Sequence, residues 1–180
     1  MRKFLVPGAL VLLFGGAQVA QAQVPSVVPS VKPSLYAGIA LPTGDFKTGF
    51  NSGYTVGGAL DLTLPASPVA FRGEGSYTSF DAQGGGEKFS DASGRVNIVL
   101  PMHMIVATPY VIGGVGYYHL TDDVDALGKF SQNKFGYNVG AGIDFPLGVM
   151  AARVEARYNH VSMDNGGAYT YVPITFGIRF

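Results

Sequence analysis

The residues best suited to chemistry are a histidine and a serine two positions apart, His160 and Ser162. A serine becomes a nucleophile when a histidine takes its proton, and that histidine needs a carboxylate to fix its tautomer and balance its charge. Residues 163–180 contain no glutamate, and their one acid, Asp164, lies in a glycine-rich loop that would hold it poorly. The set is incomplete, so we expect no catalytic residues and no enzyme activity.

Other candidate sites are weaker still. The chain has no cysteine, and its three histidines are scattered without the spacing of metal ligands. Asp122-Asp123-x-Asp125 lacks the spaced glutamate of a calcium loop, and Gly84-Gly85-Gly86 lacks the lysine and helix of a phosphate loop. The net charge of zero offers no basic surface for nucleic acid. We therefore expect no metal, no cofactor and no nucleic-acid partner.

The first segment indicates export. Arg2 and Lys3 precede an apolar, uncharged run over residues 4–16, and Ala20-Gln21-Ala22 supplies a small-residue cleavage site. This order predicts a secretory signal peptide over residues 1–22. A membrane anchor helix is the alternative, but the run is shorter than the roughly 20 residues that such a helix needs.

The rest of the chain divides into a short leader and one domain. Residues 23–34 hold three prolines and three serines and predict an extended, poorly ordered leader. Residues 35–180 then show strand-like runs separated by turn residues, which is typical of an all-β domain. The eight runs cover residues 35–42, 53–64, 69–79, 90–100, 109–120, 134–145, 149–160 and 169–180.

The connections between these runs alternate in length. Those at 65–68 and 146–148 are tight, and that at 101–108 is somewhat longer. The connections between them, at 43–52, 80–89, 121–133 and 161–168, are polar and glycine-rich. Short turns that alternate with long loops are typical of an up-and-down transmembrane barrel, with the turns in the periplasm and the loops outside. An even number of strands places both ends of the domain, and the leader, on the periplasmic side.

The charged residues of the strands all fall on one face. Side chains alternate between the two faces of a strand, and nine charges lie opposite the bulky apolar residues of their strands. They are Asp61, Arg72, Glu74, Arg95, Asp144, Arg153, Glu155, Arg157 and Arg179. The first strand carries no charge to test, and the run 109–120 is apolar on both faces, so its facing stays open.

Two kinds of barrel share this alternation. A soluble barrel would place the apolar face inside, and a membrane barrel would place the charges inside. Three features favour the membrane barrel: the cations of the charged face are all arginine, which suits desolvated networks; aromatic residues such as Tyr54 and Tyr158 lie near strand ends; and the chain ends in Phe180.

The sequence here resembles a known family. The ending Ile174-Thr-Phe176-Gly-Ile178-Arg-Phe180 is similar to the C-terminal signal that the barrel-assembly machinery reads in outer-membrane proteins. With the segments 109–118 and 154–158, it makes the chain resemble the OmpA/OmpX-type outer-membrane β-barrel domain family. The resemblance implies an all-β, eight-stranded antiparallel up-and-down transmembrane barrel in outer-membrane lipid, and we expect a monomer.

Function is less determined than fold. Because an eight-stranded barrel is just wide enough for its own side chains, we expect the charged face to fill the lumen with internal salt bridges. We therefore expect a structural or surface protein that supports envelope integrity or contacts external partners through its loops. The alternatives are a narrow ion or solute channel lined by these charges, and a hydrolase. His160 and Ser162 are similar to the His-x-Ser pair of the outer-membrane lipid A deacylases, whose acid is a glutamate further along the chain.

Overall fold

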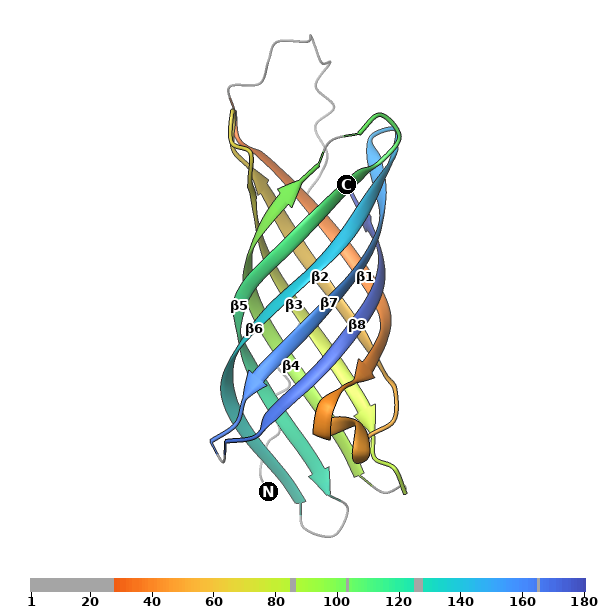
Figure 1. The fold of residues 1–180 in the computed structure, drawn as a ribbon, viewed down its shortest axis with the longest axis vertical. Helices are drawn as coiled ribbons and strands as arrows, with labels where there is room; N and C mark the ends of the chain where they lie inside the picture. Colours follow the sequence, from red (N-terminus) through yellow and green to blue (C-terminus); the bar gives the residue numbers. More distant parts are fainter. Residues whose placement is uncertain (1–27, 85–86, 103, 125–127, 165) are drawn as a thin grey trace, which may run out of the picture.

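The computed structural model describes residues 28–84, 87–102, 104–124, 128–164 and 166–180, which form a closed barrel of eight antiparallel strands (Figure 1). The strands are β1 Ser30–Pro42, β2 Gly53–Thr63, β3 Ala70–Asp81, β4 Glu87–Pro101, β5 Thr108–Val124, β6 Gly128–Leu147, β7 Met150–Ser162 and β8 Ala168–Arg179. Each strand pairs with its neighbours in the chain, and β1 pairs with β8 to close the barrel. The predicted fold is confirmed; the predicted signal peptide, residues 1–22, lies outside the described residues.

The two ends of the barrel differ, as the connection lengths predict. At the turn end, β6 and β7 join through Gly148 and Val149, and Gly148 has a φ of 69°, a left-handed conformation that glycine adopts without strain. At the opposite end, called the loop end, β1 continues into the short 3-10 helix η1, Gly44–Thr48. No helix in the described part of the chain is long and apolar enough to cross a membrane.

Several strands are longer than the sequence predicts, β1, β4, β5 and β6 most of all. β1 begins at Ser30, inside the expected leader, because Ser30 pairs with Thr63 of β2. The expected loop 121–133 is largely strand, since β5 extends to Val124 and β6 begins at Gly128. This segment is mostly polar and therefore looks like a loop, but it keeps strand pairing at the loop end, where Thr121 pairs with Ser131 and Asp122 with Phe130.

The charged face of the strands faces the lumen. Eight of the nine strand charges are buried, and the ninth, Arg179, has a side chain that is 27% exposed at the turn end. The bulky apolar residues point outward, and Val154, Phe176 and Ile178 are among those exposed on the outer surface. The predicted assignment of faces is therefore correct in every strand that carried a charge to test.

The structure also decides the facing of β5, which the sequence left open. Tyr110, Ile112, Tyr118 and Leu120 are buried in the lumen. Val111, Val115 and Tyr117, at the alternate positions, are exposed on the outer face. Gly116 shares the inner face, and a Cβ at this position would lie only 2.4 Å from Cγ of Arg95. The missing side chain gives Arg95 room to extend into the lumen, and it also hides the alternation in the sequence.

A charge on the outer face tests its contact with lipid. Val154 lies between the outward-facing rings of Phe145 and Tyr158, away from both ends of the barrel. Val154→Arg should lower the free energy of unfolding by about 2–4 kcal/mol, because an arginine near the middle of a bilayer is poorly solvated. Urea titration of the barrel in lipid vesicles measures this. The matched substitution Val149→Arg, in the exposed turn, should be nearly neutral, and equal effects of the two would contradict lipid contact at Val154.

Candidate functional site

Arginines and acids alternate along the lumen without a break. Every one of the four acids contacts two arginines, so nine side chains form a single linear series, called here the ion chain. Its order from the turn end is Arg179, Asp144, Arg153, Asp61, Arg72, Glu155, Arg157, Glu74 and Arg95. The series starts and ends on an arginine, so five cations meet four anions.

Some links of the ion chain join residues that are paired across neighbouring strands. Arg72 Nε donates to Asp61 Oδ1 at 2.5 Å, and these two residues face each other in the β2–β3 register. Arg153 Nε likewise donates to Asp144 Oδ1 at 2.7 Å, and this pair is opposed in the β6–β7 register. Strand register alone brings these groups together.

Other links cross the lumen and tie β7 to the opposite wall. Arg72 Nη1 donates to Glu155 Oε2 at 2.6 Å, and Arg153 Nη2 donates to Asp61 Oδ2 at 3.1 Å. Arg157 donates to both carboxylate oxygens of Glu74. The three charges of β7, at alternate positions, thus connect this strand with β2 and β3, which lie across the barrel.

Tyr110 completes the central part of the ion chain. Its hydroxyl donates to Glu155 Oε2 at 2.6 Å, and its ring centroid lies 5.3 Å from the guanidinium carbon of Arg72 and 5.4 Å from that of Arg153. An aromatic face near two cations adds a favourable interaction that water does not supply. Mutually bonded side chains thus cross the lumen at this level.

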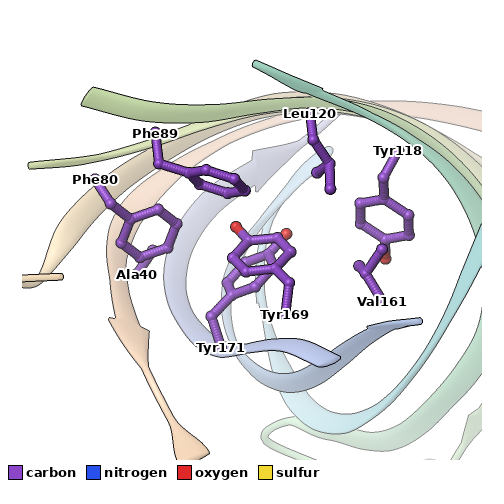
Figure 2. Packing of buried hydrophobic residues seen from close by; sticks show 8 residues of the cluster. All are labelled: Ala40, Phe80, Phe89, Tyr118, Leu120, Val161, Tyr169 and Tyr171. Carbon is purple, nitrogen blue, oxygen red and sulfur yellow. The ribbon is translucent and has the colours of Figure 1, made fainter. Parts of the chain in front are cut away.

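Above the ion chain, at the loop end, the lumen is apolar. Figure 2 shows the cluster that closes it, called here the aromatic cap. Its buried members are Ala40, Phe80, Phe89, Tyr118, Leu120, Val161, Tyr169 and Tyr171. Phe46 of η1 packs onto this cluster from the first loop, with its ring centroid 4.7 Å from that of Tyr169 and 4.3 Å from that of Phe50.

The aromatic cap is not predicted from the sequence. Phe46, Phe80 and Phe89 fall in segments that were expected to be external loops, so their rings were not assigned to the lumen. The last strand did contain an indication of it. By strand alternation, Tyr169 and Tyr171 fall on the same face as Arg179, which is the inner face, and not on the face of Phe180.

Asp91 is the one acid of the described lumen that has no cationic partner within salt-bridge distance. Its side chain is fully buried between the ion chain and the aromatic cap, its Oδ2 accepts a hydrogen bond of 2.7 Å from the Tyr169 hydroxyl, and its Oδ1 has no partner. The Tyr171 hydroxyl, also buried, is unpartnered as well. Asp91 therefore lies outside the pairing that holds the other acids.

The structure does not bring a catalytic triad together. His160 stacks on the ring of Tyr137 on the outer face, with a centroid separation of 4.8 Å, and Ser162 is exposed at the end of β7. The carboxylate of Asp164 is bonded to the ammonium group of Lys134, not to His160. The described residues also contain no group of three or more potential metal ligands; Asp125 and residues 85–86, from the two weak loop motifs, lie outside them.

Comparison with known proteins agrees with this architecture. Residues 8–180 match the family described as outer membrane protein beta-barrel domain, and the chain belongs to that family. A search of curated proteins by sequence found no match.

Solved structures of similar fold include three bacterial outer-membrane proteins. Neisserial surface protein A (NspA) is 14% identical with a TM-score of 0.70, and the alignment covers 84% of this chain and 97% of that one. The N-terminal barrel domain of Pseudomonas aeruginosa OprF is 12% identical, with a TM-score of 0.55 and coverages of 83% and 96%. A major outer membrane protein from Thermus thermophilus is 14% identical, with a TM-score of 0.55 and coverages of 84% and 98%. Identities this low establish a shared fold only.

Family and fold together define a bacterial outer-membrane protein whose apolar outer face contacts lipid. By the usual orientation of such barrels, the turn end lies in the periplasm and the loop end lies outside the cell. The ion chain therefore crosses the middle of the lumen, and the aromatic cap closes its external mouth. A cavity of about 230 Å³, lined by Asp144, Arg153 and Arg179 among others, lies at the periplasmic end.

The unequal partnering of two buried acids gives a stability test. Glu155→Gln should lower the free energy of unfolding by about 3 kcal/mol or more, because Arg72 and Arg157 each lose a buried anionic partner. Asp91→Asn should change it by less than about 1 kcal/mol, since the amide oxygen still accepts from Tyr169 and no arginine loses its partner. Denaturant titration in vesicles measures both variants, and a larger loss for Asp91→Asn would contradict the pairing described here.

Proposed function

We propose that this protein is a closed structural and surface barrel of the outer membrane, which supports the envelope or contacts external partners through its loops. The observation that carries the proposal is that the lumen is closed twice, by the ion chain and by the aromatic cap. An eight-stranded barrel has little interior beyond its own side chains, and here those side chains bond to one another. This arrangement supports rigidity rather than transport.

The external loops support a role in contact. Phe50 of the first loop forms a β-bridge with Ala82 of the next, and Lys134 holds Asp164 of the last loop. Connections that are tied to one another present a fixed surface, and fixed surfaces lose little conformational entropy on binding. The same ties would also brace the barrel mouth against lateral pressure in the envelope.

The C-terminal strand supports one further partner. Ile174, Phe176, Ile178 and Phe180 all point outward from β8 and are exposed. An exposed apolar row that ends in phenylalanine fits recognition by the barrel-assembly machinery before insertion. Because β1 pairs with β8 of the same chain, no second chain is needed to close the sheet, which fits a monomer.

Conductance measurements test the closed lumen. In planar lipid bilayers the parent protein should carry no steady current, and neither should Phe46→Ala, because the ion chain still fills the lumen below the aromatic cap. Phe71→Ala, at an exposed phenylalanine of the outer face, is the matched control. Steady current through the parent would support a channel instead, and current through Phe46→Ala alone would show that the cap is the single barrier.

Lipid analysis tests the absence of hydrolysis. Purified protein should leave lipid A intact, and Ser162→Ala should change neither stability nor lipid A, because Asp164 is held by Lys134 and leaves His160 without an acid. Mass spectrometry of lipid A after incubation measures this. Release of a fatty acid by the parent, abolished in Ser162→Ala, would make the protein an enzyme.

A deletion strain tests the envelope role. Loss of the protein should increase sensitivity to detergents that the outer membrane normally excludes, and expression of the parent chain should restore resistance. Unchanged resistance in the deletion strain would contradict the role in envelope support, and contact with external partners would then be the remaining role.

A further inference from the structure

A cavity opens where the first two strands separate. Pairing between β1 and β2 ends at Ala40 and Gly53, whereas β1 stays paired with β8 as far as Pro42. The two chain segments that continue past the last β1–β2 pair diverge, and a cavity of about 640 Å³ lies between them. Its size is within the range of roughly 300–1,000 Å³ that is usual for ligand sites.

The lining of the cavity is apolar within and polar at the edge. Leu41, Pro42 and Phe50 are buried or half-buried and form its apolar part, whereas Lys47 and Gln83 are exposed. Lys47 is the one charged residue among those that line the cavity, and it forms no salt bridge with any residue of the described chain. The cavity thus combines an apolar surface with a free cation.

Hydrogen bonds hold the chain segments around the cavity in place. The Gln83 side-chain amide donates to the carbonyl oxygens of Lys47 at 3.0 Å and Phe50 at 3.2 Å. The Gln83 backbone N–H donates to the carbonyl of Gly49 at 2.8 Å, and the Thr43 N–H donates to that of Thr170 at 3.0 Å. A preformed site avoids the entropic cost of ordering loops when a ligand binds.

The position of the cavity indicates what it meets. Tyr54, directly after Gly53, and Tyr77 are exposed on the outer face, with ring centroids 6.4 Å apart. Outward tyrosines near the strand ends of a membrane barrel mark the level of the lipid headgroups. The cavity lies just beyond this level at the external end, so it borders the headgroup region of the outer leaflet.

We propose that this cavity binds one lipid of the outer leaflet whose phosphorylated headgroup carries a net negative charge. The start of an acyl chain or the apolar backbone of the headgroup contacts Leu41, Pro42 and Phe50, and a phosphate group accepts hydrogen bonds from the Lys47 ammonium. The charge selects an anionic headgroup, and the location at the membrane boundary favours a lipid over a soluble ligand.

Native mass spectrometry of the mature barrel released from detergent micelles tests the proposal, with lipid A and phosphatidylcholine as probes. The parent should retain one molecule of lipid A and little phosphatidylcholine. Lys47→Ala should reduce lipid A retention by about tenfold or more, as expected for the loss of one charge-assisted hydrogen bond. Lys88→Ala, at an exposed lysine that does not line the cavity, is the matched control and should retain lipid A like the parent.

A second variant separates the cavity from general surface charge. Ser52→Phe places a ring in the cavity and keeps Lys47, so it should also lose lipid A, while circular dichroism should show the β-signal of the folded parent. Equal retention of lipid A by the parent, Lys47→Ala and Ser52→Phe would overturn the proposal. Equal retention of phosphatidylcholine and lipid A by the parent would overturn the selection for an anionic headgroup.

Discussion

Neutralisation of buried charge is the constraint on which the rest of this structure depends. A charged side chain in a water-poor lumen costs several kcal/mol unless partners surround it. Arginine meets this demand because its planar guanidinium carries five donors and can serve two carboxylates at once, as Arg72 does for Asp61 and Glu155. A lysine ammonium would not present two flat, divergent donor edges, which explains why the cations of the ion chain are all arginine.

Much of this architecture could be predicted from the sequence. Strand alternation placed nine charges on one face, and outward aromatic residues indicated lipid on the other. Both can be predicted because the alternation of side chains depends only on the sequence of each strand. One ion pair could also be predicted from the sequence. The tight turn at Gly148 sets the register of its hairpin, and that register opposes Asp144 and Arg153. The missing glutamate after His160 can be read from the sequence, whereas the bond between Asp164 and Lys134 cannot.

The rest depends on contacts between residues that are distant in the chain. Nothing local reveals that Glu155 meets Arg72, since that pair forms across the lumen and depends on the tilt and stagger of the whole barrel. The aromatic cap was missed for a different reason. Phe46 lies among glycine, aspartate and lysine, and only the folded path of η1 turns its ring inward. The facing of β5 was ambiguous because glycines replace the polar residues that normally mark the inner face.

The cross-lumen ties also constrain how the barrel can assemble. Arg157 reaches Glu74 only when β7 stands opposite β3, and Arg179 reaches Asp144 only when the last strand is in place. An open sheet in the bilayer would hold these groups as separate, poorly solvated ions, so partly inserted states are high in energy. Curling, insertion and closure are therefore expected to occur together, with few populated intermediates. The internal salt bridges that give the mature barrel its rigidity would in this way make its assembly a cooperative event.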